Sequence, residues 1–373
     1  MRLFIFRIFL FSIFQKKNSN IQPAMKKRGT KVVRWGVIGT GRVSNDFVLS
    51  LKHVEEAEIV MCAARSAEKA KAFASTHAIA RFGESYEDIY KNEDIDVVYV
   101  GTIHPCHYDQ VKACLMNGKH VLCEKPLTMS AEKTKELLNL SVEKKLMLQE
   151  GMWTRFFPAI QKVRELIFKS NTIGEVMCVQ SNFGVLLNWE GDRKHRALNK
   201  ALGGSAILDI GVYPLGHALL AFGSKHGMPH IAVSGVVRDN VDISVSASLT
   251  FADRYVASLT CSVAADMPNE TVFVGTKGQI VLSSPSHAPT RLTLKIRNAR
   301  EDFTVSTFDF EFPSALQKLP YNFPNSQGFF YEARAVTLAL QQGRFTALEE
   351  YPHEESLLCA RITDAMRKEL KCD

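Results

Sequence analysis

The hydrophobic pattern in the first part of the chain predicts strands that are buried on both faces. Residues 32–38 are almost all apolar, as expected for a strand that is covered by helices on both sides. Similar apolar segments, separated by segments with helical periodicity, are found at 58–64, 95–102, 120–123 and 146–150. Strands that alternate with helices predict an α/β fold with a doubly wound parallel sheet.

The pattern changes after Gly151. A helix is expected at 159–169, followed by a strand at 174–184, a polar loop at 188–202 and a helix-like segment at 203–222. Strands with short turns are then expected at 231–238, 242–251, 254–263, 270–274 and 278–283. Helices at 326–342 and 354–368 close the chain. This change predicts an α+β C-terminal domain with a mostly antiparallel sheet.

We therefore divide the chain into three parts. They are a non-globular extension at 1–30, a Rossmann-type domain at 31–152 and a second domain at 153–373. Of the 373 residues, 46% are hydrophobic and 23% are charged, as in ordinary globular proteins. The net charge is +7, but residues 1–34 contain nine Lys or Arg and no acid, so the remainder of the chain carries −2. This distribution argues against a nucleic-acid partner, which needs clustered basic residues on the folded part.

Residues 1–14 are apolar apart from Arg2 and Arg7. The stretch is too short to span a bilayer comfortably, and no small-x-small site for signal cleavage follows it. A signal peptide, an organelle presequence and a start at Met25 remain open alternatives. Eight scattered cysteines without a CxxC pair argue against zinc and against a disulfide framework. We therefore expect a reducing, cytoplasmic location, no metal site and no stable membrane span.

Gly39 and Gly41 follow the first strand with the spacing of the first two glycines of GxGxxG. Gly39 would permit the tight turn, and Gly41 would let the backbone approach a pyrophosphate at a helix N-terminus. Ser44 replaces the third glycine, and we expect its side chain to loosen the helix–strand packing slightly. At the end of the second strand stands Arg65, where an acid would bind a ribose 2′-hydroxyl. A guanidinium there would pair with a 2′-phosphate, so NADP is favoured over NAD. The next residue, Ser66, is expected to cap a helix.

Lys125 lies at the carboxyl end of the strand at 120–123, between Glu124 and Pro126. Burial beside a cationic nicotinamide would favour the neutral amine, which suits an acid–base group. Asp209 and Tyr213 are four residues apart and would share one helix face.

Six motifs occur in the same order as in the glucose–fructose oxidoreductase/inositol dehydrogenase family, and the chain resembles most its dimeric dihydrodiol dehydrogenase subgroup. They are RWGVIGTG, GTIHPCH, VLCEKPL, WTRFFP, LDIGVY and GTKG. The resemblance covers roughly residues 31–370. It implies an NADP-dependent oxidation of trans-1,2-dihydrodiols to catechols, an open-faced C-terminal sheet and a homodimer formed through that sheet. Alternatives are an NADP-dependent D-xylose or aldose 1-dehydrogenase, and a non-catalytic regulator that binds the dinucleotide.

The resemblance also implies the roles of individual residues. Lys125 matches the catalytic lysine of the family, and Asp209 matches the acid of its Asp-x-x-x-His pattern, in which Tyr213 replaces the histidine. We expect these three to be catalytic. Cofactor contacts are expected from Gly39, Thr40, Gly41, Arg42, Val43, Arg65, Ser66, Tyr99, Thr102, His104, His107, Glu124, Lys125, Trp153 and Arg155.

Overall fold

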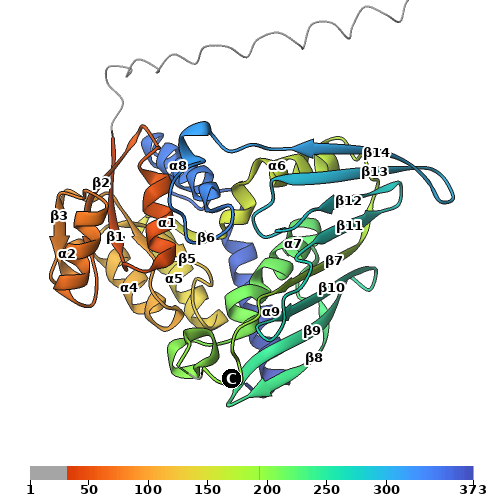
Figure 1. Ribbon diagram of the computed structural model, residues 1–373, viewed down its shortest axis with the longest axis horizontal. Helices are drawn as coiled ribbons and strands as arrows, with labels where there is room; N and C mark the ends of the chain where they lie inside the picture. The colour runs from red at the N-terminus through yellow and green to blue at the C-terminus, as the bar shows by residue number, and fades with distance from the viewer. Residues whose placement is uncertain (1–31, 193, 373) are drawn as a thin grey trace, which may run out of the picture. The chain divides into compact units, whose positions relative to one another are not determined.

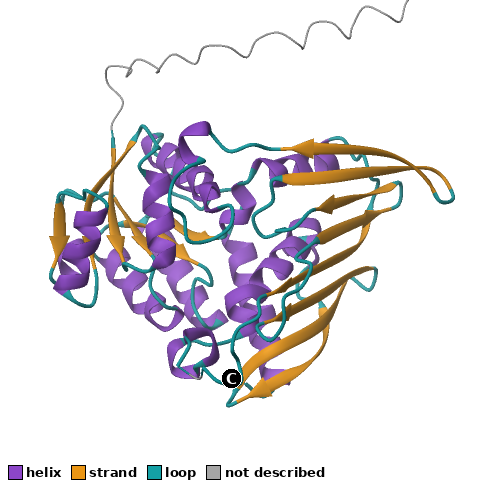
Figure 2. Ribbon diagram, in the orientation of Figure 1, coloured by secondary structure: helices purple, strands orange, loops and turns teal. Residues whose placement is uncertain are grey.

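The computed structural model describes residues 32–192 and 194–372. The predictions about residues 1–14 and Met25 lie outside this part of the chain. Within it, one sheet of six strands and a second sheet of eight strands are separated by helices (Figures 1 and 2). The predicted α/β architecture with a C-terminal, mostly antiparallel sheet is confirmed.

The first sheet is parallel and has the strand order β3-β2-β1-β4-β5-β6. Its strands are β1 (Val33–Ile38), β2 (Ala57–Ala63), β3 (Arg81–Gly83), β4 (Val97–Val100), β5 (His120–Glu124) and β6 (Leu148–Gly151). This order reverses direction between β1 and β4, and in open α/β sheets ligands bind outside the carboxyl ends of the strands at such a reversal. The fold therefore directs attention to the residues that follow β1, β4 and β5.

The connections between these strands are helical. They contain α1 (Arg42–Leu51), α2 (Ala67–Thr76), α3 (Glu87–Tyr90), α4 (His104–Met116) and α5 (Ala131–Lys144). The predicted cap at Ser66 is confirmed, since its Oγ accepts a hydrogen bond from Lys69 N at 3.2 Å. Ser130 caps α5 in the same way.

The second sheet has the order β14-β13-β12-β11-β7-β10-β9-β8 and is antiparallel except where β7 pairs with β10. Its strands are β7 (Val176–Gly184), β8 (His230–Arg238), β9 (Val241–Phe251), β10 (Tyr255–Ser262), β11 (Thr271–Gly275), β12 (Gly278–Leu282), β13 (Arg291–Ala299) and β14 (Asp302–Asp309). The sequence prediction omitted β13 and β14. Most side chains of β14 are exposed, so this strand lacks the alternation that marks a half-buried strand.

The C-terminal half also covers the first sheet. Its longer helices are α6 (Pro158–Arg164), α7 (Val212–Phe222), α8 (Phe329–Gln341) and α9 (His353–Glu369). Helix α8 packs against α1, and α9 packs against α5. Trp35 on β1 is fully buried and donates from Nε1 to Thr337 Oγ1 on α8 at 3.2 Å. Side chains from both sheets thus share one hydrophobic core.

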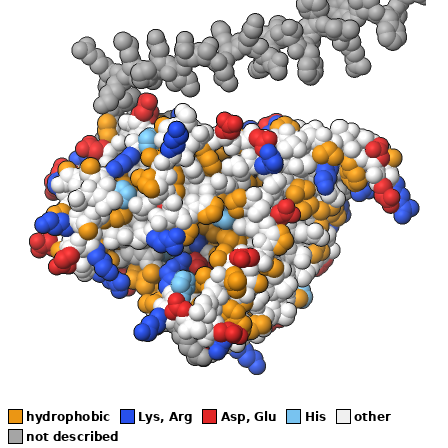
Figure 3. Space-filling model, viewed as in Figure 1, with side chains coloured by type: hydrophobic (Ala, Val, Ile, Leu, Met, Phe, Trp, Pro, Cys, Tyr) orange, Lys and Arg blue, Asp and Glu red, His pale blue; other side chains and the backbone are white. Residues whose placement is uncertain are grey.

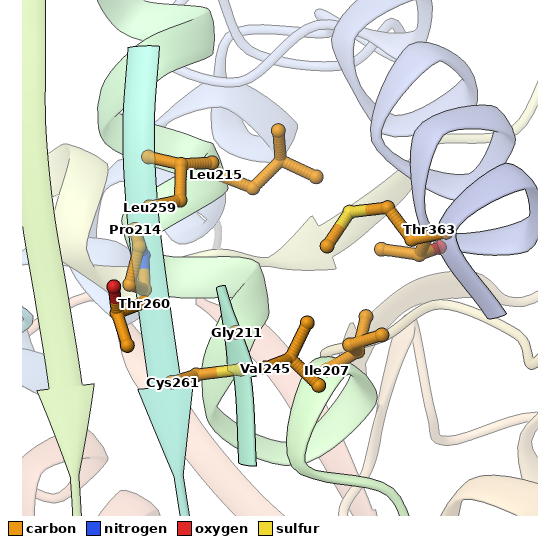
Figure 4. Close-up of a pocket in the computed structure, with 10 residues that line it drawn as sticks. Ile207, Gly211, Pro214, Leu215, Val245, Leu259, Thr260, Cys261 and Thr363 are labelled. Atoms are coloured by element: carbon orange, nitrogen blue, oxygen red, sulfur yellow. The ribbon is translucent and has the colours of Figure 1, made fainter. Parts of the chain in front are cut away.

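The helix-like segment predicted at 203–222 begins as a π-helical turn, η5 (Ile207–Gly211), and continues as α7. A small apolar cavity lies beside this turn, bounded by β9, β10 and α9 (Figure 4). Gly211 packs closely against β10, because a Cβ there would lie 3.0 Å from Cys261 Sγ. One described stretch, Lys200–Phe222, is long and apolar enough to cross a membrane, but its most apolar part is 89% buried inside the protein.

Gly328 offers a direct test of this packing. A Cβ at residue 328 would lie 1.9 Å from Phe157 Cζ, whereas one at Gly216 in α7 would meet no atom closer than 3.7 Å. We expect Gly328→Ala to lower the free energy of unfolding by about 1–3 kcal/mol through overpacking. Gly216→Ala is the matched control and should be neutral or slightly stabilising, because alanine favours helix. Equal unfolding free energies for the two variants in denaturant titrations would contradict this packing.

Candidate active site

The turn between β1 and α1 has the geometry of a phosphate-binding loop. Gly39 has φ +95°, and a Cβ there would lie 2.6 Å from Gly101 O. A Cβ at Gly41 would meet nothing within 4 Å, so the backbone is open to a ligand on that side. Helix α1 has no side-chain cap and no acid in its first turn, unlike α2 and α5. Unpaired N–H groups at a helix start attract phosphate, and Thr40 and Val43 are partly exposed beside them.

Ser44 and Arg42, in the first turn of α1, both contact other segments of the chain. Ser44 is fully buried, and its Oγ donates to Gly101 O at 3.2 Å, so it ties α1 to the end of β4 instead of loosening the packing. Arg42 is exposed, donates to Asn322 O at 3.2 Å and lies over the ring of Phe323 at 4.6 Å. A C-terminal segment therefore borders the nucleotide turn.

Lys125 follows β5 and points toward η5. Its Nζ donates to the backbone O of Asp209 at 2.5 Å and lies 3.5 Å from Asp209 Oδ1 and 5.0 Å from the centre of the Tyr213 ring. The side chains of Lys125 and Asp209 are 12% and 13% exposed. The three predicted catalytic residues therefore meet at the carboxyl edge of the first sheet. Figure 3 shows Lys, Arg and His side chains gathered near a hollow at the centre of this face.

Asp209 is held in place by its turn. Ile207 N donates to Asp242 Oδ2 at 2.7 Å, Leu208 N donates to Ser205 Oγ at 3.0 Å, and Asp209 N donates to Ser205 O at 2.9 Å. Burial alone would raise the pKa of Asp209, but the charges of Lys125 and Arg196 outweigh it and hold the pKa well below its usual value. The carboxylate is therefore ionised across the physiological range.

Tyr213 forms the wall opposite Lys125. Its hydroxyl accepts a hydrogen bond from Trp153 Nε1 at 3.0 Å, and Trp153 stacks on Phe329 at 4.4 Å between ring centres. Burial raises the pKa of Tyr213 well above its usual value. Tyr213 therefore keeps its proton and can donate it in a hydrogen bond, while Trp153 fixes the position of the hydroxyl oxygen.

Two more predicted residues adjoin this centre. His104 Nδ1 lies 3.2 Å from Gly203 O, and its Nε2 lies 4.0 Å from Asp209 Oδ1. Burial lowers the pKa of His104 to about 3, so the ring is neutral and adds no charge. Glu124 is buried, which raises its pKa. At the end of β4, Thr102 Oγ1 donates to Gln110 Oε1 at 2.6 Å.

Tyr99, His107 and Arg155, which were predicted to contact the cofactor, form hydrogen bonds within the protein around the site. The Tyr99 hydroxyl is buried and donates to Glu124 Oε1 at 2.9 Å. The ring nitrogens of His107 lie 2.9 Å from Pro126 O and 3.1 Å from Thr102 O. Arg155 donates from Nη2 to Glu355 Oε2 at 2.5 Å and to Gly216 O at 2.8 Å. Each of these polar groups is already hydrogen-bonded inside the protein.

Arg65 lies where the sequence placed it, exposed at the end of β2. The neighbouring Ser66 Oγ donates to Glu68 Oε2 at 2.8 Å. A cation and an acid therefore both border the expected position of the cofactor ribose.

Arg196 belongs to the same centre, although sequence reasoning missed it. Its Nη2 donates to Asp209 Oδ1 at 3.1 Å, from the polar segment that was predicted as a loop. The segment contains two short 3₁₀ turns, Arg196–Leu198 and Lys200–Leu202. No periodic signal in the sequence singles out this arginine.

Comparisons with known proteins agree with this geometry. The model of an oxidoreductase family with an NAD-binding Rossmann fold matches residues 33–152, and the GFO/IDH/MocA C-terminal domain matches residues 160–281. Trans-1,2-dihydrobenzene-1,2-diol dehydrogenase of Danio rerio is 36% identical over 342 residues, which are 91% of this chain and 97% of that protein. The enzyme of the same name from Homo sapiens is 33% identical over 90% of this chain and 96% of its own length.

The chain belongs to the GFO/IDH/MocA family of oxidoreductases. Among solved structures, a 3-ketoreductase from Actinomadura kijaniata in complex with NADP and TDP-benzene has a TM-score of 0.73 and 26% identity, and the match covers 91% of this chain and 98% of that one. Levoglucosan dehydrogenase in complex with NADH and levoglucosan has a TM-score of 0.80 at 19% identity, covering 92% and 98%, and so shows the shared fold. Like its family, this GFO/IDH/MocA protein is an oxidoreductase that acts on CH–OH groups with a nicotinamide dinucleotide.

The buried Glu150 behind the site predicts how the free energy of unfolding depends on pH. Glu150 Oε1 accepts from Leu127 N at 2.9 Å behind Lys125, and burial raises the pKa of Glu150 from 4.5 to about 7. Between these pH values the folded protein keeps a proton that the unfolded chain releases, so the free energy of unfolding falls as pH rises from 4.5 to 7. Glu150→Gln keeps the acceptor and removes the titration, so the variant should lose this component. If the free energy of unfolding depended on pH in the same way in both proteins, the raised pKa of Glu150 would be contradicted.

Proposed function

We propose that this protein oxidises trans-1,2-dihydrodiols of aromatic rings to catechols and uses NADP. The observation that carries the proposal is the meeting of Lys125, Asp209 and Tyr213 at the carboxyl edge of the first sheet, the edge that also carries the nucleotide turn. The names of its relatives from fish, frog and mammals support the substrate class. The intact lysine, acid and tyrosine argue against the alternative of a non-catalytic regulator.

Oxidation of a carbinol removes a hydride from carbon and a proton from oxygen. A nicotinamide bound at this site would supply the acceptor for the hydride. Lys125 receives the proton from the reacting hydroxyl in its neutral amine form, which a cationic nicotinamide nearby would favour over the ammonium. Its Nζ lies at the carboxyl edge, and one of its hydrogen bonds is fixed by Asp209 O. The resulting ketone of the ring then shifts a proton from carbon to oxygen and becomes the catechol.

Asp209 and Tyr213 position this transfer. The Asp209 carboxylate stabilises positive charge on Lys125 as the proton arrives, because it stays ionised 3.5 Å away. Tyr213 retains its proton and donates a hydrogen bond to the same substrate oxygen, with its own oxygen held by Trp153. We therefore propose Lys125 as the proton carrier and Tyr213 as the orienting group.

The choice of NADP is supported by Arg65, which is exposed at the end of β2. A guanidinium pairs with a 2′-phosphate, whereas an acid would repel it. The negative charge of Glu68 weakens the preference for NADP. The hydrogen bond from Ser66 Oγ holds the Glu68 carboxylate near the end of β2. We also propose a homodimer through the second sheet, which carries the exposed apolar residues Val236, Val256 and Val305.

The catalytic roles can be tested with NADP and trans-1,2-dihydrobenzene-1,2-diol. Lys125→Met keeps most of the side chain and removes its charge and donors, so kcat should fall by about 10²–10⁴. Binding of NADP, measured by titration, should change far less, because the nucleotide turn holds the phosphates. Near-normal kcat in this variant would refute the scheme.

Tyr213→Phe separates the two roles of the hydroxyl. We expect a kcat loss much smaller than that of Lys125→Met, because the phenylalanine removes only one hydrogen bond to the substrate. A loss as large as that of Lys125→Met would assign the proton to Tyr213 instead.

Cofactor choice is tested at the end of β2. Arg65→Asp replaces attraction with repulsion, so the affinity for NADP should fall at least about tenfold, or ~1.4 kcal/mol. The affinity for NAD, which lacks the 2′-phosphate, is the internal control and should be affected less. An unchanged affinity for NADP would contradict the pairing of Arg65 with the 2′-phosphate.

A further inference from the structure

The Arg196 side chain is partly exposed to solvent and contacts the buried site with one end. Its side chain is 44% exposed, whereas the Asp209 side chain that it contacts is 13% exposed. The contact uses one nitrogen, Nη2, which donates to Asp209 Oδ1 at 3.1 Å. Arg196 therefore reaches from the solvent-exposed segment to the buried acid that also faces Lys125.

Arg196 and Lys125 converge on the same oxygen. Lys125 Nζ lies 3.5 Å from Asp209 Oδ1, slightly farther than Arg196 Nη2. The shorter, hydrogen-bonded contact is the one with Arg196. Two cationic donors that share one acceptor atom are close enough for a small molecule between them to contact both.

The guanidinium of Arg196 has N–H donors that its contact with Asp209 does not use. Arginine carries five N–H donors in a fixed fork, and within residues 32–192 and 194–372 we find no hydrogen bond of its side chain other than that to Asp209. The ionised Asp209 partly offsets the positive charge of the two donors. A neutral ligand with hydroxyl oxygens therefore suits the position beside Arg196 and Lys125 better than an anionic ligand.

The segment that carries Arg196 is fixed by its own hydrogen bonds. His195 Nδ1 accepts from Ala197 N at 3.3 Å, and Asn199 O accepts from Gly204 N at 2.9 Å. The backbone around Arg196 is thus held by its neighbours, and Asp209 holds one nitrogen of its side chain. A selective contact benefits from such preorganisation.

We propose that Arg196 is a specificity-determining residue that donates to the second oxygen of a vicinal diol while the first oxygen reacts at Lys125. This inference rests on the proposed function, because it assigns the two neighbouring oxygens of that substrate to two donors. A contact from Arg196 to the second oxygen would favour a diol over an alcohol with a single hydroxyl.

The test compares ligands with one and two ring oxygens, namely phenol and catechol. Their dissociation constants are measured by calorimetry on the full-length protein saturated with NADP. We expect catechol to bind the unmodified protein about 10–100-fold more tightly than phenol, the usual worth of a hydrogen bond from a charged donor. In Arg196→Met this preference should shrink toward one, because catechol loses affinity while phenol changes little.

Two further variants make the result specific. Lys194→Met removes a charge from the same exposed segment and should keep the full preference for catechol. Arg196→Lys retains the charge without the fork and should keep part of it. NADP affinity should stay constant in all three variants, which shows that the site remains folded.

Two results would contradict the role of Arg196. An unmodified protein that binds phenol and catechol equally, or an Arg196→Met variant that keeps the full preference, would overturn the role of Arg196. Turnover of trans-1,2-dihydrobenzene-1,2-diol, measured in parallel, reports on the proposed function separately. Its absence together with an Arg196-dependent preference for catechol would reject the oxidation and retain the binding role.

Discussion

The ionised carboxylate of Asp209 is the constraint on which the site depends. A charge this deeply buried needs partners, and the fold supplies Lys125 from the end of the first sheet and Arg196 from the segment before η5. The turn that carries Asp209 is in turn tied to the second sheet through Asp242. The reacting lysine is therefore oriented only when both sheets are assembled, and the shared core that extends from β1 to α8 keeps them assembled.

Features that depend on adjacent residues could be predicted from the sequence. The nucleotide turn needs glycines at Gly39 and Gly41 after an apolar strand, and all of these lie next to one another in the chain. The position of Lys125 at a strand end follows from the same kind of local pattern. Its meeting with Asp209, 84 residues away, was implied by family resemblance and not by periodicity.

Other features depend on contacts that no local pattern encodes. Tyr99 and His107 lie at or just after β4, as predicted, but their side chains bond to the protein because the direction of a side chain is set by tertiary packing. Arg196 lies in a segment without periodicity, 13 residues from its partner. The mostly exposed strand β14 lacks the alternation on which strand prediction relies. The missed elements are thus those that carry no hydrophobic period in the sequence.

The central claim is that this site transfers a hydride from a dihydrodiol to NADP. The most direct measurement is the initial rate of NADPH formation by the purified protein, with trans-1,2-dihydrobenzene-1,2-diol and D-xylose offered separately and NAD replacing NADP in a parallel series. The account predicts a higher kcat/KM for the dihydrodiol than for the sugar, and a higher kcat/KM with NADP than with NAD. A protein that binds NADP but reduces it with neither substrate, or that oxidises D-xylose in preference, would contradict the account.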